Sequence, residues 1–170
     1  MKMMAIHEKL LAAIKGKENA NIAIIGKGAS IDKIHLAALE RFIVINANDS
    51  ESILPGDIGV FHHGWVLDYF EHIPPKCRLY VTDRQMPAEV EVLTARYASS
   101  SEDNELFIER FFDQQIIWLE HAAVVNCLRV ANELAIALQT RKRVFLLGFD
   151  FSFDDGFSSR VENGLHGADN

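Results

Sequence analysis

Residues 21–30, with the sequence NIAIIGKGAS, decide the fold of this chain. The segment opens with a short apolar run, which is typical of a strand buried on both faces of a parallel sheet. A glycine-rich turn follows, and its last residue, Ser30, suits the N-cap of a helix over residues 31–39. Residues 42–45 form a second apolar run. A strand, a helix and a strand in this order predict a βαβ unit, which is normally parallel and right-handed.

The same alternation continues along the chain. Apolar runs at residues 57–61, 77–81 and 143–147 predict further strands. Helical spacing of apolar residues predicts a first helix that ends at Gly16 and carries Ile6, Leu10, Leu11 and Ile14 on one face. It also predicts a short helix near residues 66–70, and helical structure over 105–139 with a break near Asp113. We therefore expect an α/β fold, a Rossmann-like three-layer domain with a mostly parallel sheet flanked by helices.

Size and composition fit one globular domain over residues 1–170. Hydrophobic residues make up 49% and charged residues 24% of the chain, both close to the globular average. The polar tail, residues 152–170, lacks a helical or strand period and ends without the look of a finished element. That ending suggests one domain of a longer polypeptide.

Charge and cysteine content narrow the partners and the compartment. The formal net charge is −7, without a basic block, which argues against nucleic acid as the main partner. The two cysteines, Cys77 and Cys127, lack a metal-site spacing and are too few for a disulfide scaffold. No apolar run approaches the roughly 18 residues of a membrane span, and the N-terminus lacks a signal-peptide core. A cytoplasmic protein is the expectation.

Four polar clusters follow predicted strands, at residues 26–30, 46–49, 62–65 and 148–155. In open parallel sheets, ligands bind outside the carboxyl ends of the strands. If the strands are parallel and adjacent, all four clusters meet on one rim. The sequence therefore predicts a ligand site at this rim.

The first cluster predicts a phosphate site. Gly26 and Gly28 let a phosphate approach the main chain, and the N-terminus of the following helix offers unpaired N–H donors. Lys27 adds a point charge and Ser30 adds a hydroxyl. The motif is neither a full G-x-G-x-x-G nor a Walker A loop, and a tight turn without a ligand is the alternative.

The other clusters each carry two interpretations. Asn46, Asn48 and Asp49 can read a base edge or a ribose hydroxyl, or they are ordinary turn residues. Adjacent strand residues point to opposite faces, so we expect one of His62 and His63 at the rim and the other packed, without a shared metal. The last cluster contains three aspartates, Asp150, Asp154 and Asp155. They either bind a magnesium ion that diphosphate oxygens also coordinate, or form a solvated acidic loop.

The segment 22–31 resembles the opening of bacterial sialyltransferases of glycosyltransferase family 42, and of the motility-associated-factor proteins that glycosylate flagellin. Those proteins begin with a strand followed by a G-x-G-P-S-L turn. The segment 144–151 resembles their second hallmark, a late strand that ends in G-x-D-F. The resemblance covers most of residues 20–155.

This resemblance implies a transferase that uses a CMP-activated ulosonic acid such as sialic acid and needs no metal cofactor. The nucleotide would lie over Gly26, Gly28 and Ser30, with Asn48 near the ribose or base. The turn at Gly148–Asp150 would form another wall. The acceptor would be a sugar or a protein. A histidine after the G-x-D-F strand serves as the base in the family, and His166 stands in that region here; in a flexible tail it is otherwise an ordinary surface residue.

The chain departs from the family pattern at several positions. Lys27 replaces an asparagine of the first turn and Ala29 replaces its proline, while His63 stands where an asparagine is expected after the third strand. The small Ser/Thr-Gly step that opens the long helix is Asn126-Cys127-Leu128 here. At these matching positions, His63 and Asn126 are the expected nucleotide-binding residues. These departures keep two alternatives open: a non-catalytic nucleotide-binding module of surface-sugar synthesis, or a magnesium-dependent phosphoryl-transfer enzyme. An oligomer is possible in each case.

Overall fold

The computed structural model describes residues 2–98, 107–113, 115–150 and 156–161. The α-helices in this part of the chain are α1 (Lys2–Ala13), α2 (Trp65–His72), α3 (Phe107–Phe111) and α4 (Ala123–Ala137). The 3₁₀ helices are η1 (Ala29–Lys33), η2 (Leu36–Leu39) and η3 (Ser50–Ser52). The strands are β1 (Ile22–Ile25), β2 (Ile43–Ala47), β3 (Ile58–Val60), β4 (Leu79–Thr82), β5 (Val92–Thr94), β6 (Arg96–Tyr97), β7 (Trp118–Leu119) and β8 (Val144–Leu147).

The main sheet confirms the predicted α/β fold. Within the described residues it has six strands in the order β5-β4-β3-β2-β1-β8, and every neighbouring pair is parallel. Ile24 of β1 lies level with Ile45 of β2 on one side and with Leu146 of β8 on the other. The chain builds the sheet outward from β1 to β5 and then returns to add β8 on the opposite side of β1. The boundary between β1 and β8 is therefore the topological switch point, where open sheets bind ligands.

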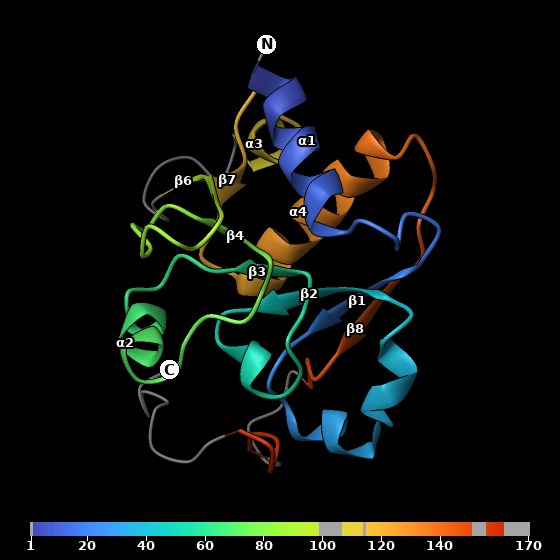
Figure 1. Ribbon diagram of the computed structural model, residues 1–170, viewed down its shortest axis with the longest axis vertical. Helices are drawn as coiled ribbons and strands as arrows, with labels where there is room; N and C mark the ends of the chain where they lie inside the picture. Colours follow the sequence, from blue (N-terminus) through green and yellow to red (C-terminus); the bar gives the residue numbers. More distant parts are fainter. Residues whose placement is uncertain (1, 99–106, 114, 151–155, 162–170) are drawn as a thin grey trace.

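Helices cover both faces of the sheet (Figure 1). The long helices α1 and α4 pack together on one face, over a core that includes Leu10, Ile24 and Leu134, all of which are fully buried. The 3₁₀ helices η1 and η2 cover the other face of β1 and β2. Helix α2 packs through Val66 in a separate cluster with Phe61 and Tyr80. Within the described part of the chain, no helix combines the length and the apolar character that crossing a membrane requires.

The predicted helix over residues 31–39 is wrong. Two short 3₁₀ helices replace it, and Ser30 lies within η1 rather than before a helix. Gly28 holds the N-cap position without a side-chain cap. Asp32 of η1 accepts hydrogen bonds from Ser158 and Ser159, which are more than a hundred residues away. These long-range contacts hold the segment in its 3₁₀ conformation.

The predicted helical stretch over 105–139 is interrupted more deeply than expected. The break near Asp113 is present, but β7 and a loop occupy the middle of the stretch. The buried Arg129 of α4 holds this segment, because its guanidinium donates to the backbone carbonyl oxygens of Arg110, Asp113 and Ile116. Strands β5, β6 and β7 are also absent from the sequence-based prediction.

The last strand differs from the strands inside the sheet. Strands β1 to β4 are buried throughout, as their apolar runs predict. Strand β8 has a similar apolar run but lies at the edge, and Val144, Phe145 and Leu146 are each about 40% exposed, at 37%, 42% and 42%. An apolar run therefore identified the strand without giving its place in the sheet.

Candidate functional site

The polar clusters after β1, β2, β3 and β8 lie at the carboxyl ends of the sheet and contact one another. The backbone N–H of Gly28 donates to the carbonyl oxygen of Gly148, 2.7 Å away. The Lys27 ammonium lies 2.8 Å from the Asp49 carboxylate and 4.7 Å from the centre of the Trp65 ring. The structure thus brings four distant segments together, and we call this surface the rim.

Gly26 and Gly148 are required by close packing between β1 and β8. A Cβ atom on Gly26 would lie 2.5 Å from the Gly148 carbonyl oxygen, which real side chains do not tolerate. Gly148 also has a φ of +72°, in the left-handed region that favours glycine. These glycines allow the ends of β1 and β8 to pack closely, so the glycine pattern alone does not indicate a phosphate site.

An acidic side chain occupies the donors of the predicted phosphate site. The backbone N–H of Ser30 donates to the Asp150 carboxylate at 2.8 Å, and the Ser30 hydroxyl donates to its other oxygen. These hydrogen bonds lower the pKa of Asp150. A Cβ atom on Gly28 would lie 2.5 Å from that carboxylate. The turn therefore holds an anionic oxygen, supplied by the chain itself.

Lys27 forms an internal ion pair rather than an open positive charge. Its partner, Asp49, is completely buried, and the ammonium also lies 5.1 Å from the centre of the Phe157 ring. The Asp49 carboxylate therefore offsets the positive charge of Lys27, which the sequence-based interpretation expected to contact a ligand phosphate. Asp49 positions the lysine, and no sequence pattern predicted this pairing.

Asn48 combines two unfavourable features at the rim. It has a φ of +53°, in the left-handed region, although it is not a glycine. Its Oδ1 atom is buried without a hydrogen-bond partner, while its backbone N–H donates to Val60 at 2.9 Å. A buried unpaired acceptor destabilises a fold by roughly 1–3 kcal/mol, and left-handed geometry adds a smaller cost, because asparagine adopts it more readily than most residues. Such residues are concentrated at functional sites.

Two of the predicted nucleotide-binding residues lie buried with their amides in use. Asn46 donates from Nδ2 to the Ser50 hydroxyl and to the Leu54 carbonyl oxygen, at 3.2 and 3.0 Å. Asn126 exchanges two hydrogen bonds with the main chain of Glu120, at 2.6 and 2.8 Å. Both amides stabilise loops, so the prediction that they contact a nucleotide has no support in the geometry.

Three histidines gather next to the rim, and we call His62, His63 and His121 the histidine cluster. The ring centres of His62 and His63 are 3.8 Å apart, and those of His63 and His121 are 5.7 Å apart. The two neighbouring rings lie side by side because they follow the end of β3, where strand alternation no longer applies. The prediction that the two side chains point to opposite faces is therefore wrong, although His62 is the more buried of the two, at 4% exposed, and His63 is half-buried.

The surroundings of His62 and His63 favour neutral imidazoles. Burial is the largest cause and the nearby His63 the second of a lowered His62 pKa, which is about 4. The pKa of His63 is lowered by burial, and then by His121 and Arg84. A neutral imidazole can accept a proton or a hydrogen bond at neutral pH. His121 and Arg84 had no place in the sequence-based site, because no spacing ties them to His63.

A segment from the far end of the chain covers the glycine-rich turn. The backbone N–H of Ser158 donates to the Lys27 carbonyl oxygen at 2.7 Å, and the Ser158 hydroxyl donates to Asp32. The remaining predicted residues of this region, Asp154, Asp155 and His166, lie outside the described residues.

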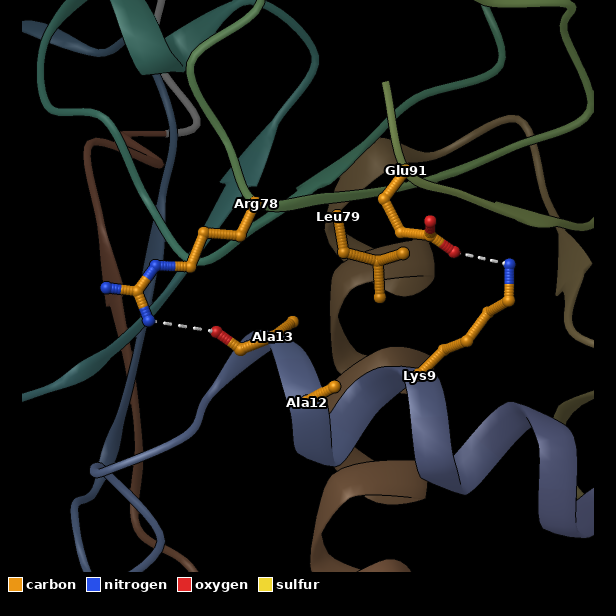
Figure 2. Close-up of a pocket in the computed structure, with 6 residues that line it drawn as sticks. All are labelled: Lys9, Ala12, Ala13, Arg78, Leu79 and Glu91. Carbon is orange, nitrogen blue, oxygen red and sulfur yellow. Dashed lines mark hydrogen bonds and ion pairs between the residues drawn. The ribbon is translucent and has the colours of Figure 1, made fainter. Parts of the chain in front are cut away.

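Neither a metal-binding group nor the hollow beside α1 offers an alternative site in the described part of the chain. Among residues 2–98, 107–113, 115–150 and 156–161, no group of three or more metal-binding side chains is arranged to hold an ion. A hollow beside α1 and the start of β4 lies at the amino ends of the strands, away from the rim (Figure 2). Its charged groups already have partners, since Lys9 pairs with Glu91 at 2.6 Å and Arg78 donates to the Ala13 carbonyl oxygen. We therefore place the candidate site at the rim.

Comparisons of the chain with protein-family models, with curated proteins and with solved structures found no match. The resemblance to glycosyltransferase family 42 thus stays a hypothesis from the sequence.

Proposed function

We propose that the rim binds a nucleotide and that the chain is a glycosyltransferase-like domain that takes a CMP-activated sugar acid as its donor. The observation that carries this proposal is Asn48, which lies after β2 with left-handed backbone geometry and a buried unpaired oxygen. A fold retains such a residue when it has a role beyond stability. Asn48 also lies between the loops that follow β1 and β3, where a ligand of an open sheet would contact it.

The contact between Ser30 and Asp150 supports an anionic ligand. The Ser30 N–H and hydroxyl already hold two carboxylate oxygens. A phosphate presents oxygens of the same charge and the same hydrogen-bonding capacity. In the proposed complex, the donor phosphate takes the place of the Asp150 carboxylate, and Asn48 contacts the ribose or the base.

A second candidate function is a non-catalytic nucleotide-binding module. The ion pair between Lys27 and Asp49 favours this module, because the ammonium is paired with a buried carboxylate and does not stabilise a departing phosphate. Both candidates predict nucleotide binding, and they differ in turnover of the donor. The magnesium-dependent alternative stays a prediction, since two of its three aspartates lie outside the described residues.

The test is isothermal titration of the full chain with CMP, CDP, UDP, GDP and NAD, with and without magnesium. We expect selective binding of CMP that does not depend on the metal. In the Asn48→Gly variant, glycine adopts the same φ without a Cβ atom, so the free energy of unfolding should not fall. The affinity for CMP should fall at least about tenfold, the equivalent of roughly 1.4 kcal/mol.

The matched control is Gln139→Gly. Gln139 is the other described non-glycine residue with a positive φ, at +51°, and it lies just after α4. Its replacement should preserve or raise stability and leave CMP affinity unchanged. Equal affinity in the Asn48→Gly variant and the wild type would remove the observation on which the proposal depends, and no binding to any of the five nucleotides would overturn the proposal.

A further inference from the structure

The histidine cluster contains one imidazole that is fixed and one that is positioned to react. The His62 ring stacks on Tyr97 with its centre 4.3 Å away and an angle of 9° between the planes. Its Nε2 atom lies 3.3 Å from the His121 carbonyl oxygen, and its own carbonyl accepts a hydrogen bond from Arg84. His62 is thus held on three sides, and it supports the neighbouring ring of His63.

His63 is connected to the proposed phosphate region through one aromatic ring. The rings of His63 and Trp65 are nearly parallel, with centres 6.2 Å apart. The same Trp65 ring lies 4.7 Å from the ammonium of Lys27, which belongs to the turn after β1. A reacting group near His63 would therefore lie beside the region where the donor phosphate is proposed to bind.

We propose that His63 accepts the proton from the attacking hydroxyl in the transfer reaction, and that the acceptor is a hydroxyl-bearing sugar lying beside Trp65. This inference rests on the proposed function. The half-buried aromatic ring of Trp65 offers the apolar surface on which the C–H face of a sugar ring can pack. The ring of His121, nearly perpendicular to that of His63 with its centre 5.7 Å away, limits the orientation of the His63 imidazole.

The proposed step is balanced. The hydroxyl oxygen of the acceptor forms a bond to the anomeric carbon of the sugar acid, and its proton passes to an imidazole nitrogen of His63. The bond between that carbon and the phosphate oxygen breaks, and CMP leaves with the electron pair. When water replaces the sugar, the same step gives hydrolysis of the donor, so the inference can be tested without a known acceptor.

The charges around His63 keep it available as a base. His121 and Arg84 lower its pKa, after the larger effect of burial, while Asp83 raises it. His62, the remaining titratable neighbour, is neutral at the same pH because burial lowers its pKa to about 4. The neutral form of His63 is therefore present at neutral pH, and acidification removes it.

The test follows the release of CMP from CMP-sialic acid, with water as the acceptor, as a function of pH. We expect the His63→Gln variant to bind CMP within about twofold of wild type and to release CMP at least roughly 100-fold more slowly, without the acidic limb of kcat/KM. The His121→Gln variant should shift that acidic limb to higher pH, because it removes a side chain that lowers the pKa of His63. The control is His72→Gln, which changes an exposed histidine at the end of α2.

The imidazole resonances of His63, followed by NMR during a pH titration, give a readout that is independent of turnover. Their pKa in the wild type should match the acidic limb, and it should rise in the His121→Gln variant. If the His63→Gln variant releases CMP at the wild-type rate, the inference is overturned, whereas the proposed function survives as long as the wild type binds CMP. If the His166→Ala variant alone is inactive, the base is His166. Parallel loss of CMP binding and turnover in the His63→Gln variant also overturns it, in favour of a ligand contact. Absence of CMP binding to the wild type overturns both proposals.

Discussion

Two polar clusters of this molecule begin within three residues of each other on the chain, yet they differ in every property that concerns function. The first is a buried network around Glu51, in which the carboxylate accepts hydrogen bonds from the Tyr80 hydroxyl and from the Lys76 backbone N–H. The second is the rim around Asn48 and His63. Glu51 is completely buried and bonded, whereas Asn48 has an unpaired oxygen and His63 has a lowered pKa.

The difference separates polar residues that hold the fold from polar residues that are available to a ligand. In the Glu51 network, the Tyr80 hydroxyl also accepts from the backbone N–H groups of Lys76 and Cys77, at 2.9 and 3.0 Å. Burial raises the pKa of Cys77 and of Tyr80, so both stay protonated. Such a network is stable because its members are satisfied by one another. The rim is less satisfied, and a ligand could complete it.

The largest expected effect comes from breaking the buried network. The Tyr80→Phe variant removes the hydroxyl that donates to Glu51 and leaves a buried carboxylate with one fewer partner. We expect the free energy of unfolding to fall by about 3 kcal/mol, because an unsatisfied buried charge is costly. Denaturant unfolding measures this loss, and CMP affinity should not change.

Tyr97→Phe is the matched control for this variant, since it removes a hydroxyl from a half-buried tyrosine and keeps the ring that stacks on His62. It should cost far less stability. Equal losses in the two variants would contradict the distinction between the network and the rim.

A second effect, on acid stability, comes from the histidine cluster. The folded-state pKa of His62 is about 4, below its ordinary value of 6.5, so the unfolded chain binds the proton more readily. Stability is therefore unaffected above about pH 6.5 and falls as the pH drops toward 4, by up to roughly 3 kcal/mol. The carboxyl groups with lowered pKa values, including Asp113 and Asp150, lose their contribution only at lower pH.

Unfolding measured from pH 7.5 to pH 4.5 should show this decline in the wild type. The His62→Phe variant keeps an aromatic ring against Tyr97 and should lose most of the slope. An unchanged slope would assign the acid sensitivity to groups other than His62, including His63, whose pKa is also lowered.

The smallest expected effect concerns the carboxylate that occupies the turn. The Asp150→Ala variant frees the Ser30 donors, so CMP affinity should rise about threefold to tenfold, less than roughly 1.4 kcal/mol. Titration calorimetry measures the change. Asp113→Ala is the control, because it removes a carboxylate that accepts from Trp118 away from the rim. Weaker binding in the Asp150→Ala variant would mean that Asp150 contributes to the ligand site instead of competing for it.

The strands of the main sheet were predictable where four or more apolar residues follow one another, as at residues 22–25 and 144–147. Strands β5, β6 and β7 are two or three residues long, too short for a recognisable period. Strand β3 is as short as β5, but it lies within the longer segment 57–61 that predicted it. The 3₁₀ helices were not predictable, because contacts from Asp150 and Ser158 fix residues 30–32 from more than a hundred positions away. Local sequence contains no information about such contacts.

The place of the candidate site was predictable from the rule for open sheets, and its internal chemistry was not. Asn46 and Asn48 are two residues apart and of the same type, but one is bonded within the core and the other is unpaired at the rim. The direction of β2 and the left-handed turn after it decide the difference. Lys27 was expected to meet a phosphate, and its pairing with Asp49 depends on a turn that sequence patterns do not specify.

The close approach of Gly26 and Gly148 also has a consequence for how the chain assembles. Strands β1 to β4 pair with neighbours that come next in the chain, so they can join in order as the polypeptide is synthesised. Strand β8 pairs with β1 across more than a hundred residues, a contact with a high loop-closure cost. On the ribosome, the boundary that holds the glycine-rich turn stays open until residue 148 has emerged. The candidate site is therefore among the last parts of the described fold to form.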